Sequence, residues 1–392
     1  MKRIVLIISL FLSLGFISEA KSAVSFADYA VSSSDTLTAK QQKKVRKANL
    51  TLKKGTVYVG EVYRHRPYGE GKAVYKNGDV YEGAFVKGKR SGKGTMTYAN
   101  GDKYEGEFEQ DFIHGEGKYY YADGRVFDGE WNNGVREDAG RMDYTNGDYY
   151  IGSLDDDVRS GYGTYIFANG ASYIGEWENN EYCGEGVFVW SDGSRYSGMW
   201  LAGKRNGYGE FMASDSSAYK GEWLNNLCEG KGVFTGVEGD TYEGSFKGGL
   251  WHGEGLYISS DSSVYKGEFV DGMRHGKGSM HFANGDVYTG DWENNKRCGK
   301  GIYTWANGDV YEGDWKDDTM NGAGVLRTTS GVEYKGGYFD GNESGAGVAV
   351  DKYGVRYEGT FVEGQRHGKF FIKDSAGNVI KECVYNLGIQ KK

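Results

Sequence analysis

The stretch YEGAFVKGKRSGKGTMTYANGDK, residues 81–103, decides the fold, because the chain restarts with YEGEFEQ at residue 104. With Tyr58 taken as position 0, steps of 23 residues define fourteen windows without an insertion or deletion. Each window begins with Tyr, except that the fourth begins with Phe127. A fixed period of this length indicates a repeat array, in which each unit packs on its neighbours. The windows span residues 58–379 and so occupy most of the chain.

Other positions of the repeat are nearly constant. Position 2 is Gly in every window, position 11 is Gly except at Asp138, and position 13 is Gly except at Phe370. Position 4 is aromatic except at Val62 and Leu154, and position 15 is always apolar. The 65 glycines of the chain therefore have fixed places among regularly spaced rings, which is not typical of a disordered chain.

Each window is predicted to form a β-hairpin. In YEGEF, residues 104–108, Tyr, Gly and Phe alternate with two Glu residues, which indicates a strand with one solvated face. Residues 100–102 (NGD) predict a tight turn between windows, and residues 87–91 (KGKRS) predict a longer hairpin loop. Because Gly at positions 2 and 13 has no Cβ, we expect neighbouring rings to lie flat over the backbone there.

The segments YEGEF…HGEGKYYYADG and YEGDW…NGAGV closely resemble MORN repeats, over about four fifths of the chain. The resemblance implies an all-β fold, an elongated single-sheet solenoid of consecutive antiparallel β-hairpins. It also implies a scaffold or adaptor whose groove-forming sheet face binds a peptide or helix, and phosphoinositide binding has been proposed for the family. Phe127, Asp138 and Phe370 depart from the pattern, so we expect a local distortion at residues 137–139 and a C-terminal cap after residue 370.

The segments that flank the array have compositions of their own. Residues 1–20 combine a basic start, an apolar stretch and a small-x-small cleavage site, which predicts a signal peptide and an exported protein, periplasmic or secreted. Residues 21–57 are predicted to be a polar and basic lead and cap, with a short helix near residues 39–48. The basic run at residues 40–54 favours either a solvated cap over the first strand edge or a contact with an acidic surface. Residues 380–392 are predicted to be a cap strand and tail.

Charge and motifs exclude several function classes. The formal net charge of −8 argues against nucleic acid as a partner and does not favour membrane contact. The chain contains no GKS or GKT, HExxH or CxxC motif and no Ser between glycines at both two-residue spacings. We therefore expect no catalytic residues and no cofactor.

Cysteine and histidine spacing argues against disulfides and metal sites. Two strands per repeat give roughly 10 Å between equivalent positions, so Cys183, Cys228, Cys298 and Cys383 stand too far apart to pair. Four histidines share position 10, where we expect them to lie in loops and bond their own turns: His114, His252, His275 and His367. The Asp residues that follow the turn glycines favour turn stabilisation over calcium binding.

The aromatic positions supply the candidate binding residues. A Trp at position 4 fits either a partner anchor or the core of the fold itself. Position 17 becomes small at Ala213, Gly236 and Ser259, so we expect the apolar face to open over residues 196–264. The candidate partner-binding residues are Trp200, Phe211, Trp223, Phe234, Phe246 and Tyr257.

These features predict a non-enzymatic scaffold that binds a protein or peptide on its aromatic face. Two alternatives stay open. A structural protein of the cell envelope would form homo-oligomers, and a peripheral lipid-binding protein would use the basic run at residues 40–54.

Overall fold

The computed structural model describes residues 36–391. The predicted signal peptide, residues 1–20, and residues 21–35 of the predicted lead lie outside the described residues. The chain divides into two units, residues 1–115 and residues 116–392, and the division falls within β7 (Phe112–Tyr120). No helix in the described part of the chain is long and apolar enough to cross a membrane.

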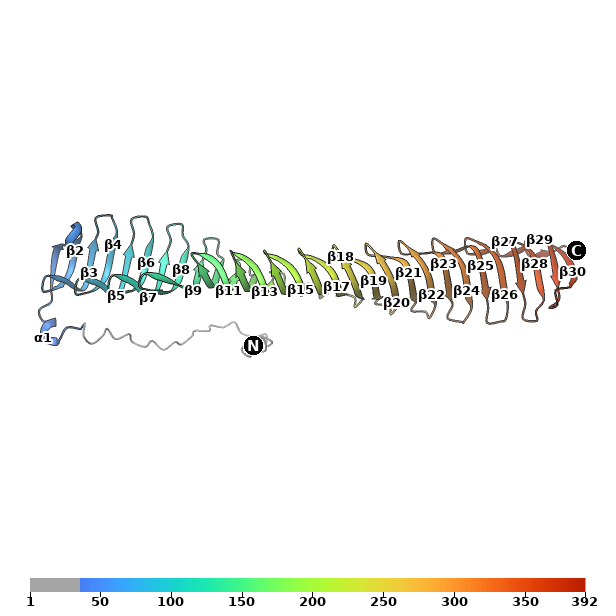
Figure 1. Ribbon diagram of the computed structural model, residues 1–392, viewed down its shortest axis with the longest axis horizontal. Coiled ribbons are helices and arrows are strands. Elements are labelled where there is room, and N and C mark those ends of the chain that lie inside the picture. The colour runs from blue at the N-terminus through green and yellow to red at the C-terminus, as the bar shows by residue number, and fades with distance from the viewer. Residues whose placement is uncertain (1–35, 392) are drawn as a thin grey trace. The chain divides into compact units, whose positions relative to one another are not determined.

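Unit 1 begins with a short helix and continues as antiparallel strands (Figure 1). The helix is shorter than predicted, because residues 46–51 extend the sheet as an edge strand that pairs with β2. The elements before β7 are α1 (Ala39–Gln42), β1 (Arg46–Thr51), the 3₁₀ turn η2 (Lys53–Gly55), β2 (Val57–Tyr63), β3 (Arg66–Val74), β4 (Val80–Val86), β5 (Lys89–Thr97) and β6 (Lys103–Glu109).

Unit 2 consists of strands alone after β7. From β8 to β31 consecutive strands pair antiparallel, so the chain adds hairpin to hairpin in an open, elongated sheet (Figure 1). The predicted fold class is confirmed. The strands are β8 (Val126–Asn132), β9 (Val135–Asp143), β10 (Tyr149–Asp155), β11 (Val158–Ile166), β12 (Ser172–Glu178), β13 (Glu181–Val189), β14 (Arg195–Leu201), β15 (Lys204–Met212), β16 (Ala218–Leu224), β17 (Leu227–Thr235), β18 (Thr241–Lys247), β19 (Leu250–Ile258), β20 (Val264–Val270), β21 (Met273–His281), β22 (Val287–Glu293), β23 (Lys296–Thr304), β24 (Val310–Lys316), β25 (Thr319–Arg327), β26 (Glu333–Phe339), β27 (Asn342–Val350), β28 (Arg356–Val362), β29 (Gln365–Lys373), β30 (Val379–Asn386) and β31 (Ile389–Gln390).

The two kinds of turn have the opposite lengths from those predicted. The segment expected to be a long loop, residues 87–91, contains a turn of only two residues, because β4 ends at Val86 and β5 begins at Lys89. Lys87 and Gly88 both have positive φ, 54° and 90°, which is typical of a type I′ turn. The segment expected to be tight, around residues 100–102, belongs to a five-residue connection between β5 and β6.

The core of the single-layer sheet is made by tyrosines that cover glycines. Tyr196 is fully buried, and Gly198 and Gly209 face each other on adjacent strands beneath its ring. A Cβ added to Gly209 would lie 2.3 Å from the Tyr196 hydroxyl oxygen. That hydroxyl donates a hydrogen bond of 3.0 Å to the carbonyl of Met199. The glycine pair thus lets one ring lie on the backbone, as predicted, and the ring needs no second layer to be buried.

Two windows depart from the repeat pattern, the fourth and the last. The hairpin of β8 and β9 keeps the register of the other repeats, with Gly129 opposite Gly140. The ladder between β9 and β10, however, ends at Ala139 opposite Ser153 and lacks the pair of position 11 with position 4 that other repeats have, so the departure expected at residues 137–139 lies at Asp138. In the last repeat, the ring of Phe370 covers Gly359 and is fully buried. The covering ring therefore comes from β29 rather than from position 0.

Candidate functional site: arginines on an aromatic sheet face

One face of the sheet in unit 2 carries the side chains of positions 0, 4, 9, 15 and 17. We call it the ring face. From Tyr150 to Phe361 its buried rings at positions 0 and 4 form a continuous edge-to-face series: the ring of Tyr196 lies 5.0 Å from that of Trp200 and 5.4 Å from that of Trp223. The rings at position 15, such as Phe211 and Phe234, are only half-buried and pack on this series.

Position 9 brings guanidinium groups onto the ring face. A β-bulge follows each glycine pair, and it places position 9 opposite position 4, as in the pair of Arg205 with Trp200. We call the unit 2 arginines at this position the arginine row: Arg136, Arg159, Arg205, Arg274, Arg297 and Arg366.

Arg205 shows how a member of the row is held. Its guanidinium carbon lies 4.2 Å from the ring centre of Trp223 and 5.4 Å from that of Phe211. Cation–π attraction of this kind is strongest where the cation is partly desolvated. Burial lowers the pKa of Arg205, and it lowers the pKa of Arg274 as well. The row therefore presents positive charge within an apolar surface.

The turn of the next hairpin clamps four of these arginines, Arg159, Arg205, Arg274 and Arg297. The backbone N–H of Arg205 donates to Oδ1 of Asn226 at 2.9 Å, and Nη2 donates to the Asn226 carbonyl at 3.1 Å. Asn226 returns a backbone bond of 3.0 Å to the Arg205 carbonyl. Asn226 has a φ of 73°, a conformation that Asn tolerates better than most residues. The guanidinium orientation is thus fixed by a turn one repeat away.

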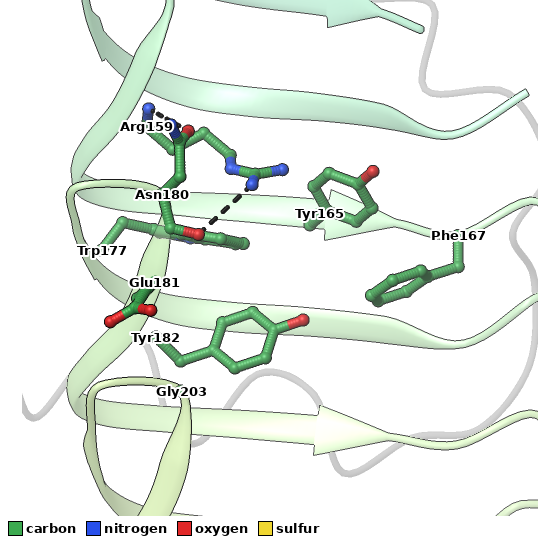
Figure 2. Close-up of a pocket in the computed structure, with 8 residues that line it drawn as sticks. All are labelled: Arg159, Tyr165, Phe167, Trp177, Asn180, Glu181, Tyr182 and Gly203. Atoms are coloured by element: carbon green, nitrogen blue, oxygen red, sulfur yellow. Dashed lines mark hydrogen bonds between the residues drawn. The ribbon is translucent and has the colours of Figure 1, made fainter. Parts of the chain in front are cut away.

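A shallow cavity of about 270 Å³ lies beside Arg159 (Figure 2). The Arg159 guanidinium stands 4.6 Å from the ring centre of Trp177 and 4.8 Å from that of Tyr165, and Nη2 donates to the Asn180 carbonyl at 3.2 Å. Three successive hairpins supply its lining: Arg159, Tyr165, Phe167, Trp177, Asn180, Glu181, Tyr182 and Gly203. The cavity combines rings with one fixed cation, so it can take an apolar group that carries negative charge.

Acidic residues at position 21 fasten one repeat to the next. Asp148 accepts hydrogen bonds from the Tyr165 hydroxyl at 2.6 Å and from the Ala168 amide at 2.8 Å. Burial alone would raise the pKa of Asp148, but these bonds and one from Asn146 outweigh burial and lower the pKa. Asp286 makes the same contacts with Tyr303 and Ala306. These aspartates therefore stabilise turns, as the sequence indicates, and also orient a ring at position 15.

Residues 155–157 read DDD, which predicts a solvated loop, but Asp157 is not solvated. It is half-buried, accepts hydrogen bonds from Tyr121 at 2.9 Å and Arg125 at 3.0 Å, and forms a close ion pair with Arg136. Burial opposes ionisation, but the bonds from Arg136 and Tyr121 lower the pKa of Asp157. Arg136 is therefore neutralised within the chain.

The six predicted binding residues fall into two groups. Trp200, Trp223 and Phe246 are buried in the core, with 5–6% of their surface exposed, and Nε1 of Trp200 donates to the Gly186 carbonyl at 3.2 Å. Phe211, Phe234 and Tyr257 are half-buried at position 15 of the ring face. Trp223 and Phe211 meet around Arg205, whereas Tyr257 lies 5.2 Å from Trp251. Their role in binding stays a prediction.

The histidines lie elsewhere than predicted. His252, His275 and His367 belong to β19, β21 and β29 rather than to loops, because the adjoining turns take only two residues. The four cysteines are free, and they lie in four different strands. Within residues 36–391, no three His, Cys, Asp or Glu side chains gather in an arrangement that could hold a metal ion.

The arginine row is the feature that the sequence reasoning missed. Arginine occupies seven of the fourteen windows at position 9, which could have been noticed. The polar composition of KGKRS, however, predicts a loop at that position, where an arginine side chain would be solvated. A two-residue turn moves it into a strand on the ring face.

The repeat geometry agrees with a family comparison. Thirteen segments match the MORN repeat model, and together they cover well over half of the chain: residues 58–80, 81–103, 104–124, 127–149, 150–172, 173–195, 196–217, 219–241, 242–264, 265–287, 288–310, 311–332 and 357–369. The chain belongs to the MORN-repeat family. MORN repeats are a non-enzymatic repeat family whose members generally mediate protein or membrane interactions. The window that begins at Tyr334 is not among the matches, although β26 and β27 form the same hairpin there.

No curated protein matches the chain significantly. Solved structures give weak likenesses. The TCP domain of SAS-4 (dCPAP) from Drosophila melanogaster, in complex with a proline-rich motif of Ana2, is 13% identical with a TM-score of 0.25, over 38% of this chain and 86% of that one. A mutant TCP10 domain of CPAP from Danio rerio is 11% identical with a TM-score of 0.13, over 80% of this chain and 99% of that one. Virginiamycin B lyase from Staphylococcus aureus is 12% identical with a TM-score of 0.11, over 81% and 94%. At these TM-scores, none of the likenesses bears on function.

Proposed function

We propose that this MORN-repeat protein is a non-enzymatic scaffold that binds a protein partner on the ring face of unit 2. One observation carries the proposal: the ring face presents half-buried rings and guanidinium groups, and between residues 116 and 391 every element is a strand of the same sheet. Within those residues no helix or second sheet covers the face. Apolar rings with polar groups beside them are what protein partners bind.

The opposite face also has exposed apolar side chains, such as Tyr208 at 55%, but charged residues stand among them. Lys220 forms an ion pair with Glu210, and Lys300 forms one with Asp314. Such exposed pairs contribute little to affinity, because solvent screens them. The ring face is the better candidate for recognition.

The proposal is tested by two neighbouring substitutions of the same chemistry. Phe234→Glu places a carboxylate among the rings, whereas Val233→Glu places one on the opposite face, where Val233 is already 40% exposed. With the protein as bait in an extract of its own cells, we expect Phe234→Glu to lose partners that both the wild type and Val233→Glu retain. Circular dichroism verifies that both variants are folded. Equal capture by all three baits would contradict the proposal.

We also propose that the protein is exported, on the strength of the basic, apolar and small-x-small pattern of residues 1–20. Removal of that segment would leave a chain that begins at Lys21. N-terminal sequencing of the protein from its own cells tests this, and an intact Met1 or a retained apolar segment would contradict it.

A further inference from the structure

Members of the arginine row form two kinds of site, and Arg366, which is followed by a turn of Leu387 and Gly388, belongs to neither. In the first kind, the turn residue of the next hairpin is Asp: Arg297 lies 3.1 Å from a carboxylate oxygen of Asp318. In the second kind, the same turn position is Asn, and the arginine has no ion pair among the described residues. The second kind comprises Arg159 with Asn180, Arg205 with Asn226, and Arg274 with Asn295.

The difference between the two kinds is one of charge alone. Nε of Arg274 lies 3.3 Å from the amide oxygen of Asn295, and Nε of Arg297 lies 3.1 Å from the carboxylate of Asp318. The hydrogen bonds are therefore alike, but only Asp neutralises the guanidinium. Asp148 and Asp318 act on Arg159 and Arg274 at longer range, without an ion pair. Arg205 has no such acid, and none of its hydrogen bonds uses Nη1.

The ring-face positions around these three arginines carry charge of one sign, and Glu181 lines the Arg159 cavity from outside those positions. From Arg159 to Trp305, the positions that form the ring face contain no Asp or Glu, although the whole chain has a net charge of −8. A partly buried guanidinium without a counter-ion has a desolvation cost in free energy. A ligand carboxylate that serves as its counter-ion makes a charge-assisted hydrogen bond with it. The face is thus complementary to an acidic ligand.

We propose that the ring face binds an acidic protein segment, in which carboxylates lie beside apolar or aromatic side chains and pair with Arg159, Arg205 and Arg274. This rests on the proposed function and names the chemistry of its partner. The cavity beside Arg159, which Tyr165, Phe167 and Tyr182 line, receives an apolar side chain next to a carboxylate (Figure 2).

The repeat spacing sets the distances between the carboxylates. Arg159 and Arg205 stand two repeats apart, and Arg205 and Arg274 stand three repeats apart. With two strands per repeat, these separations are roughly 20 Å and 30 Å along the sheet. A helix covers them with about 13 and about 20 residues, at 1.5 Å per residue.

The test uses two fluorescein-labelled copolymers of matched length, acidic poly(Glu,Tyr) and uncharged poly(Gln,Tyr), with fluorescence anisotropy as the readout. We expect the wild type to bind the acidic copolymer and not the uncharged one. The triple variant Arg159→Gln, Arg205→Gln, Arg274→Gln removes three charges and retains amide donors. Each charged contact that is fully made contributes at least about 1.4 kcal/mol, or roughly a factor of ten in affinity. Because some of the three contacts are made only in part, we expect the triple variant to bind on the order of 100-fold more weakly.

Two further variants separate charge from packing. The control Lys231→Gln, Lys266→Gln, Lys335→Gln removes the same charge from exposed lysines outside the ring face, and it should bind like the wild type. The variant Asn180→Asp, Asn226→Asp, Asn295→Asp leaves every arginine in place but supplies the carboxylate that Asp318 gives to Arg297. It should also lose affinity while remaining folded, which a purely structural role for the arginines would not predict.

The outcomes distinguish this inference from the proposed function. If Phe234→Glu loses its captured partner while both ring-face charge variants retain it, the acidic partner is refuted and the scaffold function stands. If no ring-face variant affects capture, the scaffold function itself falls. Equal binding of both copolymers, or of neither, overturns the inference. The inference is also overturned if the wild type binds phosphatidylserine vesicles but not the acidic copolymer. That result would assign the arginines to a lipid surface.

Discussion

At the scale of single residues, the fold depends on a tyrosine that occupies the space two glycines leave open. Tyr150, Tyr196 and Tyr242 are each fully buried, although the sheet has one layer. Each hydroxyl donates to the carbonyl three residues ahead, at 2.9–3.0 Å. The ring is therefore anchored to backbone at both ends, and a side chain on either glycine would displace it.

The variant Gly209→Ala tests this arrangement. The added methyl would lie 2.3 Å from the Tyr196 hydroxyl and 2.5 Å from its ring, so the ring must move. We expect a loss of about 1–3 kcal/mol in the free energy of unfolding, as for other overpacked cores. Hydrogen exchange of the β14 and β15 amides measures the loss locally. Glu210→Ala, next in sequence and exposed, is the control, and a loss no larger than that of the control would contradict the prediction.

Buried phenols also predict how stability depends on pH. Burial raises the pKa of Tyr150, Tyr196 and Tyr334 to about 12, from an ordinary value near 10. Between these values the folded chain holds protons that the unfolded chain has lost, so stability is complete below about pH 10 and falls as the pH rises toward 12. We expect phenolate absorbance at 295 nm to rise together with the loss of the β-sheet signal in circular dichroism. Complete ionisation near pH 10 in a chain that stays folded would refute this.

At the scale of elements, the two-residue turns both close each hairpin and connect it to its neighbour. Asn294 and Asn295 have φ of 50° and 70°, and Asn295 accepts a hydrogen bond of 2.9 Å from the backbone N–H of Arg274 in the preceding repeat. In other repeats Gly takes the second turn position, as at Gly272, which keeps the backbone bond to Trp251 but has no side-chain acceptor. Asn and Asp, as at Asp318, therefore meet both requirements, whereas Gly meets only the first.

Substitution of Asn295 separates these two requirements. Asn295→Gly retains the positive φ and loses the side-chain acceptor, so we expect a loss of about 1 kcal/mol. Asn295→Ala loses both, and the left-handed conformation costs a further 1–2 kcal/mol or so. Thermal unfolding monitored by tryptophan fluorescence should give the highest midpoint for the wild type, a lower one for Asn295→Gly and the lowest for Asn295→Ala. A more stable Ala variant would contradict the proposed role of the turn.

The sequence predicted the hairpins but not their exact turns. The alternation around Tyr104 and the 23-residue period determine strands and their order, because each repeats fourteen times. Turn length was wrong because KGKRS looks like a loop by composition, whereas the type I′ turn needs only Lys87 and Gly88. That error concealed the arginine row. Burial of Trp200 and Trp223 was equally undecidable from composition, since it depends on the β-bulge that sets them against neighbouring strands.

At the scale of the molecule, unit 2 has only local packing. Each of its strands from β8 to β31 pairs with its neighbours in the chain, and the ring of one window contacts the rings of the next, as Tyr265 does with Phe269 and Trp292. Stability in such arrays is close to a sum over repeats and their interfaces. The number of repeats is therefore not fixed by the fold.

Deletion of one whole repeat tests this additivity. Removal of residues 242–264 joins Thr241 to Tyr265, which occupies the same repeat position as Tyr242. We therefore expect a folded protein with a similar circular dichroism spectrum. Removal of only residues 253–264 deletes about one strand and disrupts the ring pattern. We expect that variant to lose cooperative unfolding. Identical behaviour of the two deletions would refute the repeat as the unit of stability.

The order of strands in unit 2 has a mechanical consequence. The strands β8 to β31 follow one another across the sheet in chain order. Tension applied between the ends of this unit would therefore break the hydrogen bonds of one strand pair after another, and not those of all pairs together. Each hairpin that opened would release 23 residues, or roughly 75–83 Å of extended chain. A protein built in this way would yield under load in many small, equal steps, and it would act as an extensible tether.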